Sequence, residues 1–370
     1  MHIPFLNLKK ITACHAEEIH QAVLNVVDSG HYLKGNETFL FEKEYAQFIG
    51  TPHAIACGNG LDALNLIFKA LLNLKHLKKG DEVLVPANTF IATILAITHN
   101  DLVPVLLEPS WDTLQINENE IENKITSKTR ALMLVHLYGR NAATPKMIEL
   151  CHKHHLLLLE DNAQAQGCCF ENQKTGSLGI AAAHSFYPGK NLGALADAGA
   201  VTTHDEELAW MIQTLGNYGS SQKYVFDWIG QNSRMDEINA AILRIKLKHL
   251  HAHNQHRQKI GEFYFEHLKH SQKIILPQKT KPNENVFHLF PIFSNQRDDL
   301  QIYLKQNGIE TLIHYPIAPH KQKCYAHFQP WQNLNLPITE KIHNEELSLP
   351  ISPVLTLEEA KYIVDVLNQF

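Results

Sequence analysis

Short apolar runs alternate with helical patterns through the first two-thirds of the chain. The runs are almost continuously apolar, which is typical of strands buried on both faces of a parallel sheet. We expect strands at 53–56, 82–85, 103–107, 131–136, 156–160 and 198–203. Helices are expected between them at 16–28, 38–48, 61–74 and 145–155. This alternation predicts an α/β fold whose mainly parallel sheet is flanked by helices.

The pattern changes after residue 235. A long helical stretch at 236–267 is expected to leave the first domain, and it is followed by strands at 286–293 and 311–314 and helices at 297–307 and 357–368. A chain of 370 residues is too long for one small core. We therefore predict a large domain at 1–245 and a smaller C-terminal α+β domain at 246–370.

Composition and charge exclude several classes of protein. The chain is 44% hydrophobic and 19% charged, with a net charge of −5 and no basic stripe, which argues against a nucleic-acid partner. No apolar stretch reaches the ~18–20 residues of a membrane span, and the N-terminus lacks a signal-peptide pattern. We expect a cytoplasmic protein that has no membrane partner.

Cysteine and histidine do not indicate a metal site. The six cysteines show no C-x-x-C spacing, so reduced thiols are the simplest interpretation. The pairs formed by His249, His251, His253 and His256 could chelate an ion on one helix face. Because no cysteine or carboxylate joins them, we interpret them as a solvated face and predict no metal site.

Two residues indicate chemistry when they are taken together. Asp161 ends a buried apolar run, and Lys190 follows 29 positions later in a loop rich in glycine and proline. Taken alone, Asp161 could be a helix cap or a metal ligand, and Lys190 could be a solvated lysine. Joined at this spacing, with Ser185 as a phosphate ligand, they predict a pyridoxal phosphate (PLP) enzyme. Lys190 would form the Schiff base and carry the proton, Asp161 would keep the ring nitrogen protonated, and Gln164 would donate to the phenolate oxygen.

A second segment is suited to the phosphate of the cofactor. Gly58, Asn59 and Gly60 follow a strand and open a helix, so backbone N–H groups and the helix dipole could bind a dianion. The alternative is a glycine-rich turn that caps a helix. The segment lacks the features of a Rossmann fingerprint or a P-loop. Phe90, just after the strand 82–85, could stack on the cofactor ring or be an ordinary core residue.

Over essentially its whole length, the chain resembles the DegT/StrS family of PLP-dependent nucleotide-sugar aminotransferases, which have the fold-type I architecture. The motifs that carry the resemblance are GHYLKG at 30–35, GNGLDAL at 58–64, PANTF at 86–90, HLYG at 136–139, EDNAQA at 160–165, SFYPGKNLG at 185–193, NYG at 217–219, NSRMD at 232–236 and IHYP at 313–316. The form around Lys190 resembles the members that aminate C-3 of a keto sugar and form dTDP-3-amino-3,6-dideoxyhexoses.

The resemblance implies further site residues and a homodimer with composite active sites. Asn232 would match the asparagine that reaches the cofactor phosphate of the neighbouring subunit. The substrate residues implied are Tyr187, His314 and Tyr315 near the sugar and Tyr32 in the wall of the substrate cleft, with Lys223 and Arg257 as candidates for pyrophosphate contacts. For these last two residues, solvent-facing charges are the alternative.

The function implied is transfer of an amino group from L-glutamate to the C-3 keto group of a dTDP-linked 3-keto-6-deoxyhexose. The product would enter a surface polysaccharide such as lipopolysaccharide, or a glycosylated metabolite. The alternatives are amination at C-4 or of a UDP-sugar, a related sugar dehydratase, a non-catalytic regulator that binds PLP or a nucleotide sugar, and an NAD-dependent oxidoreductase. The dehydratases typically carry histidine at the Lys190 position, a regulator would have lost Lys190 or Asp161, and the oxidoreductase would need a glycine fingerprint.

Overall fold

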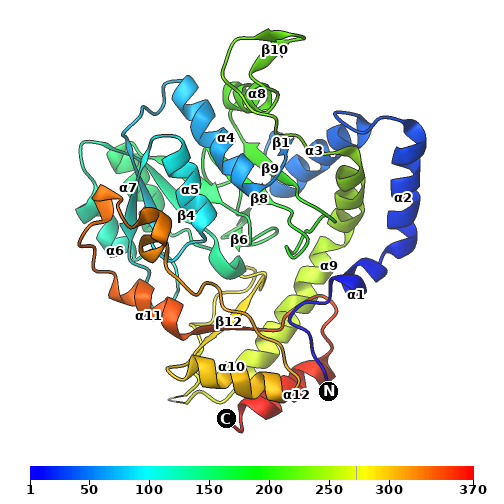
Figure 1. Cartoon of the computed structure of the whole chain (residues 1–370), viewed down its shortest axis with the longest axis vertical. Coiled ribbons are helices and arrows are strands. Elements are labelled where there is room, and N and C mark those ends of the chain that lie inside the picture. Colours follow the sequence, from blue (N-terminus) through cyan, green and yellow to red (C-terminus); the bar gives the residue numbers. More distant parts are fainter. Residues whose placement is uncertain (272) are drawn as a thin grey trace.

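A seven-stranded sheet forms the centre of the protein (Figure 1). The computed structural model describes residues 1–271 and 273–370. In spatial order the strands are β1 (His53–Cys57), β9 (Gly199–Thr203), β8 (Ala181–Ser185), β5 (Leu157–Asp161), β4 (Thr129–Val135), β2 (Glu82–Pro86) and β3 (Val103–Leu107). Strand β9 runs antiparallel to both of its neighbours, whereas the pairs from β8 to β3 are parallel. The predicted mainly parallel, mixed sheet is confirmed.

Helices cover both faces of this sheet. Alternate residues of β4 show the two faces, because Ala131 and Met133 belong to the core under α4 and α5, while Leu132 and Leu134 pack with α7. The helices are α1 (Leu8–Ala13), α2 (Ala16–Ser29), α3 (Asn36–Ile49), α4 (Gly60–Asn73), α5 (Ile91–His99), α6 (Glu118–Ile121), α7 (Pro145–His154), α8 (Glu206–Leu215), α9 (Glu237–His267), α10 (Arg297–Gln306), α11 (Pro337–Glu345) and α12 (Leu357–Leu367).

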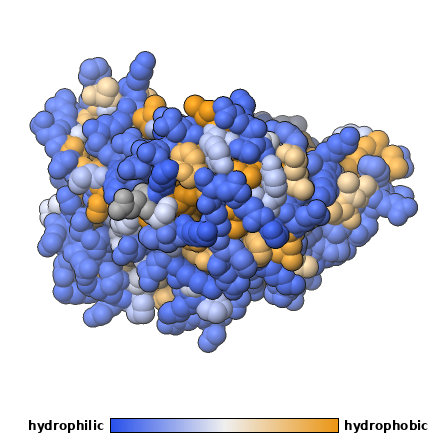
Figure 2. All heavy atoms as spheres, turned by 90° about the horizontal axis from the view of Figure 1, so that it is seen from below, coloured by the Kyte–Doolittle hydropathy of each residue, from blue (hydrophilic) through white to orange (hydrophobic). Residues whose placement is uncertain are grey.

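A second hydrophobic core lies around the C-terminal half of α9. Ile260 and Tyr264 of this helix pack with residues of α10, α12 and a two-stranded sheet formed by β12 (Phe290–Phe293) and β13 (Glu346–Leu349). Seen from the end that carries α10 and α12, the surface is mostly hydrophilic, with hydrophobic side chains in a few separate places (Figure 2). Helix α9 runs continuously through residue 245, so the proposed division of the chain at 245/246 would fall within one helix.

Local chemistry explains where α4 begins. The side chain of Asn59 accepts a hydrogen bond from the N–H of Asp62 at 2.9 Å and so caps the helix at Gly60. Gly199 of β9 lies so close to this turn that a Cβ there would be 2.4 Å from the backbone of Asn59. The absence of a side chain at residue 199 therefore allows the sheet to hold the start of α4 in place.

Several expected elements differ from the structure. The strand predicted at 311–314 is wrong, because Leu312 makes only an isolated bridge to Ser348. The strand predicted at 286–293 is shortened to β12. Helices α1, α5, α6, α8 and α11 and strands β8 and β13 were given no predicted range. Strand β8 consists mainly of alanine, which has a low β-propensity, so burial rather than propensity determines this strand.

Three further features complete the fold. The hairpin of β10 (Ser220–Gln222) and β11 (Val225–Phe226) projects from the rest of the chain (Figure 1). A short hairpin is formed by β6 (Cys169–Phe170) and β7 (Gln173–Lys174). Among the residues that the structure describes, no helix is long and apolar enough to cross a membrane.

Candidate active site

A cavity of about 800 Å³ opens at the carboxyl ends of β4, β5 and β8. This is the edge at which open α/β sheets bind ligands, because the loops that follow parallel strands meet there. Most of the residues predicted from the sequence lie in its wall: Asn59, Gly60, Phe90, Asp161, Gln164, Ser185, Tyr187, Lys190, Arg257, His314 and Tyr315.

Asp161 is the last residue of β5, and its carboxylate is held from two sides. The Thr93 hydroxyl donates to Oδ2 at 2.8 Å, and the backbone N–H of Ala163 donates to Oδ1 at 3.1 Å. Burial raises the pKa of the Asp161 carboxyl, although these hydrogen bonds and the nearby Lys190 oppose the rise. A carboxylate fixed in this way can accept a hydrogen bond from a protonated ring nitrogen in the cavity.

Lys190 enters the cavity from the loop after β8. Its backbone N–H donates to the carbonyl of Tyr187 at 2.8 Å, which closes a tight turn. Burial lowers the pKa of the Lys190 amine to about 8, against the favourable charge of Asp161. The amine is therefore neutral far more often near neutral pH than a lysine in water, and the neutral amine is the form that attacks an aldehyde.

The start of α4 forms a cradle beside Ser185. The first N–H groups of a helix have no partner inside the helix, and the dipole there favours a dianion. A Cβ at Gly60 would lie 2.7 Å from the Cβ of Ser185, so any side chain at residue 60 would fill this space. Together with the lysine and the buried carboxylate, the cradle fits the phosphate, ring nitrogen and aldehyde of PLP.

Gln164 and Tyr315 are linked across the cavity. The Gln164 Nε2 donates to the Tyr315 hydroxyl at 3.0 Å, while its Oε1 accepts from the N–H of Tyr138 at 2.6 Å. One N–H of the amide remains for the predicted bond to the cofactor. The Phe90 ring lies 4.9 Å from that of Tyr315 between centroids, inclined at 37°. Phe90 thus faces the cavity, although its stacking on a cofactor ring stays a prediction.

His314 is fixed next to this pair. Its Nδ1 lies 2.9 Å from the Ser348 hydroxyl, and its carbonyl accepts from the Tyr138 hydroxyl at 2.8 Å. Burial lowers the pKa of His314 to about 4, and the charge of Lys190 acts in the same direction. A neutral imidazole is therefore presented to the cavity.

Arg257 reaches the cavity wall from α9 but is deeply buried. Its Nη1 donates to the carbonyls of Ile351 at 2.9 Å and Phe287 at 3.2 Å, whereas its Nε has no partner among the described residues. Burial lowers the pKa of Arg257 to about 9. Solvent exposure, which was the alternative for this residue, is wrong, because the side chain is enclosed by protein.

Four predicted residues do not line the cavity of their own chain. The N–H of Gly58 instead donates to the Ser233 hydroxyl at 2.9 Å, beside the predicted phosphate site. Tyr32, Lys223 and Asn232 are exposed, and Lys223 lies in the projecting β10–β11 hairpin. The roles of these three residues stay predictions.

Comparison with known proteins identifies the family. The model of the DegT/DnrJ/EryC1/StrS aminotransferase family matches residues 13–368. The chain belongs to this family. It is 47% identical over 368 residues to a dTDP-3-amino-3,6-dideoxy-alpha-D-galactopyranose transaminase of Aneurinibacillus thermoaerophilus, with 100% of this chain and 99% of the relative covered. The prediction of a PLP-dependent aminotransferase of this family is thereby confirmed.

Solved structures confirm the predicted fold of the aminotransferase. The crystal structure of DesV from Streptomyces venezuelae, in complex with a ketimine intermediate, has a TM-score of 0.94 and 41% identity and covers 100% of this chain and 98% of its own. NtdA from Bacillus subtilis, with bound PMP, has a TM-score of 0.91 and 31% identity, and the match covers 100% of this chain and 85% of the NtdA chain.

Two residues at the site were missed from the sequence. Thr93 follows Phe90 by less than one helical turn, inside an apolar segment that gave no sign of chemistry. His288 was placed in a strand, but it lines the cavity, and its Nδ1 donates to the Asn191 Oδ1 at 3.2 Å. Burial holds the pKa of His288 well below its ordinary value. Only the fold brings these side chains to Asp161 and Lys190.

Proposed function

We propose that the aminotransferase moves an amino group from L-glutamate to the C-3 keto group of a dTDP-linked 3-keto-6-deoxyhexose. The observation that carries the chemistry is the position of Lys190 and Asp161 in one cavity, together with the cradle at the start of α4. The 3-amino sugar named for the Aneurinibacillus relative supports the choice of substrate. We propose that the product enters a surface polysaccharide such as lipopolysaccharide.

Each residue around the proposed cofactor position has a separate proposed role. PLP, when bound, would act as an electron sink for the carbon that loses its proton. Lys190 would hold the aldehyde end and move a proton at the reacting carbon, which suits an amine whose pKa is about 8. Asp161 would keep the proton on the ring nitrogen, and Gln164 would orient the phenolate oxygen.

Binding groups surround this centre. Ser185 and the backbone of Gly58, Asn59 and Gly60 are proposed to hold the phosphate, and Phe90 to pack on the ring. Tyr187, His314 and Tyr315 line the part of the cavity next to Lys190 and are proposed to contact the sugar. Arg257 has a guanidinium Nε without a partner among the described residues, which supports a role in binding an anionic group such as the pyrophosphate.

We further propose a cytoplasmic homodimer with composite active sites. Asn232 of each subunit would reach the phosphate site of the other, and Tyr32 and Lys223 would contact its substrate. The projecting hairpin supports this arrangement, because Tyr224, Phe226 and Ile229 expose 80%, 59% and 88% of their surface. Exposed apolar side chains in this number mark an interaction surface.

The test begins with the purified protein and PLP. We expect an absorbance band of lysine-bound PLP that shifts with L-glutamate and is absent from Lys190→Ala. The glutamate-treated protein is then offered dTDP-3-keto-6-deoxyglucose, dTDP-4-keto-6-deoxyglucose or a UDP-linked 3-keto sugar, and the products are identified by NMR. Return of the original band only with the dTDP-linked 3-keto sugar supports the proposal. Amination at C-4 or of the UDP sugar would replace the substrate, and a protein that never binds PLP would overturn the reaction.

A further inference from the structure

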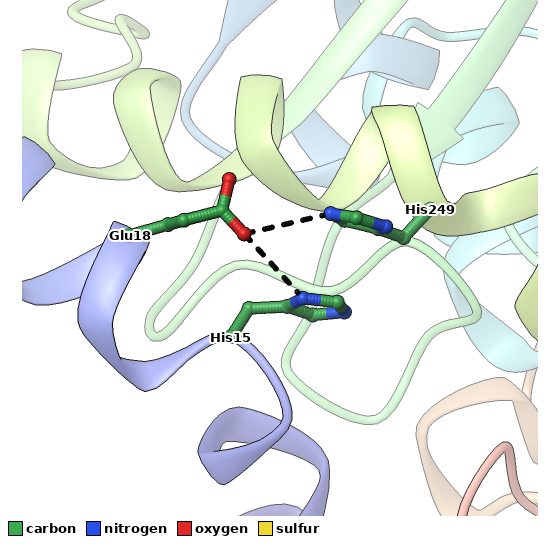
Figure 3. A group of neighbouring side chains, drawn as sticks. All are labelled: His15, Glu18 and His249. Atoms are coloured by element: carbon green, nitrogen blue, oxygen red, sulfur yellow. Dashed lines mark ion pairs between the residues drawn. The ribbon is translucent and has the colours of Figure 1, made fainter.

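A group of histidines and one carboxylate lies where the N-terminal helix α2 packs on α9, away from the cavity. His15 is the residue just before α2, Glu18 is in the first turn of α2, and His249 faces them from α9. Figure 3 shows that the Glu18 carboxylate points at both imidazole rings. From the sequence, His249 had only histidines nearby on its own helix; the fold adds the carboxylate.

The donor atoms of the group are close together. The Glu18 Oε1 lies 3.8 Å from Nδ1 of His15 and 3.7 Å from Nε2 of His249, and one ligand atom from each residue lies within 4.8 Å of the others. Both distances are beyond a normal hydrogen bond. The Nε2 of His249 is buried and has no hydrogen-bond partner among the described residues. A buried nitrogen without a partner costs free energy of folding, and a bound ligand would supply the partner.

We propose that His15, Glu18 and His249 bind a divalent transition-metal ion, Zn²⁺ in the first instance, which ties α2 to α9. Two imidazoles and a carboxylate with a water molecule in the fourth position make an ordinary tetrahedral zinc site. Two ligand atoms of such a site lie about 3.3 Å apart, given metal–ligand bonds of about 2.0–2.2 Å. Glu18 Oε1 therefore needs to approach each nitrogen by only about 0.5 Å, whereas the two nitrogens, which lie within 4.8 Å of each other, need to approach by up to about 1.5 Å.

The two rings must also change their tilt. His15 and His249 stack with centroids 3.9 Å apart and planes inclined at 15°, so their nitrogen lone pairs lie in nearly parallel planes. Binding requires the rings to open until both lone pairs meet at the ion. Glu18 can follow, because 53% of its side chain is exposed and free to move, and His249, with 36% exposed, has room to turn.

His253 supports His15 from the next turn of α9. The Nε2 atoms of His15 and His253 lie 3.4 Å apart, so one donates and the other accepts. When Nδ1 of His15 binds a metal, its Nε2–H can donate to His253. A hydrogen bond from the second ring nitrogen is what metal-bound histidines usually make.

The charges around the group decide which ion fits. Glu18 supplies the negative charge, whereas Lys246 on α9 contributes a positive charge nearby. The ammonium of Lys246 donates to the carbonyl of Gly193 at 2.6 Å, so its position is fixed by another bond. With two imidazoles and one carboxylate, the group favours Zn²⁺, Ni²⁺ or Cu²⁺ over Mg²⁺ or Ca²⁺, which prefer oxygen ligands.

The test is a titration of the PLP-saturated, untagged protein with Zn²⁺, in competition with a chromophoric chelator. Because the chain has 24 histidines, weak background binding is expected and is measured in every variant. We expect one tight site in the wild type, a rise in Tm with Zn²⁺, and visible absorption of four-coordinate Co²⁺ when Co²⁺ replaces Zn²⁺.

Two variants and one control distinguish the site from the background. Glu18→Gln and His249→Ala should weaken the tight site by about tenfold or more and abolish the rise in Tm. His251→Ala changes an exposed histidine of the same helix and should leave both unchanged. Because Glu18 is half exposed, its variant should fold normally, and the Tm in EDTA checks this. Equal loss in His251→Ala, or no loss in Glu18→Gln, would overturn the site.

Discussion

Thr93 on α5 donates a 2.8 Å hydrogen bond to the Asp161 carboxylate at the end of β5. Thr93 is fully buried, and its hydroxyl lies 2.8 Å from that of Thr89. A chain of two hydroxyls, from Thr89 in the β2–α5 connection and Thr93 on α5, therefore fixes one carboxylate oxygen, while Ala163 fixes the other. The carboxylate is oriented by the protein alone, and such preorganisation reduces the cost of reorganisation during reaction.

Thr93→Val should lower the kcat/KM of the glutamate half-reaction by roughly 10- to 100-fold. Valine has nearly the same shape, and a hydrogen bond to a charged group contributes about 1.5–3 kcal/mol. Stopped-flow absorbance of the PLP-bound protein measures the rate. Thr98→Val is the matched control, because Thr98 lies on the same helix but bonds to the Tyr325 hydroxyl. An equal effect of both variants would show that helix α5, rather than the bond to Asp161, is responsible.

Asp161→Asn should retain PLP but transfer the amino group about 10²- to 10⁴-fold more slowly. The amide is neutral and cannot stabilise a proton on the ring nitrogen, so the ring loses most of its capacity as an electron sink. Bound PLP is followed by absorbance and the amino transfer by single-turnover kinetics. A variant with wild-type turnover would refute the role of this carboxylate.

The sequence was sufficient for every strand of the seven-stranded sheet except β8 and for the proposed catalytic pair, but not for the groups that orient this pair. Asp161 and Lys190 could be found because a buried strand and a glycine-rich loop each have a recognisable sequence pattern. Thr93 and His288 could not, since one lies in an apolar helix and the other in an apolar segment. Their roles depend on contacts between residues far apart in sequence. The strand expected at 311–314 failed for a related reason, because Leu312 pairs with β13 at only one point.

The rate at which the apoprotein takes up PLP should rise with pH, with the midpoint of the rise near pH 8. Burial lowers the pKa of Lys190 to about 8, and the neutral amine attacks the aldehyde, so uptake rises as pH increases through that value. A free lysine analogue, whose pKa is about 10.4, serves as the control under the same conditions. The rate of uptake is measured by absorbance from pH 6 to about 10.5. A midpoint close to that of the free amine would contradict the lowered pKa.

Glu160→Gln should destabilise the protein strongly, although Glu160 itself does not line the cavity. The Glu160 carboxylate is buried and accepts from His136 Nε2 at 3.0 Å and from the N–H groups of Gly176, Leu178 and Gly179. Burial alone would raise its pKa, but the bond from His136 and the backbone donors lower it below the ordinary value. Breaking one partner of a buried pair costs about 3–5 kcal/mol of unfolding free energy.

The same pair sets a pH dependence of stability. A carboxyl whose pKa is lowered by folding stabilises the fold above its unfolded pKa of about 4.3, and this contribution is lost as pH falls through the folded pKa. Urea unfolding between pH 7 and about 3 should therefore show a smaller loss for Glu160→Gln than for the wild type. Glu122→Gln, which removes an exposed partner of Lys153, should behave as the wild type at pH 7. Equal stability of both variants would contradict the importance of the buried pair.

Two inactive variants should restore activity in mixed dimers if the active sites are composite. Lys190→Ala removes the lysine of its own cavity, whereas Asn232→Ala removes a group proposed to act in the cavity of the other subunit. In a mixed dimer, one site carries both defects and the other carries none. Random reassortment of equal amounts therefore restores about a quarter of the wild-type sites. Activity is measured after co-expression with two different affinity tags, and mixtures of Lys190→Ala with Asp161→Asn, which both act in their own cavity, are the control. Recovery in the control as well, or in neither mixture, would contradict the placement of Asn232.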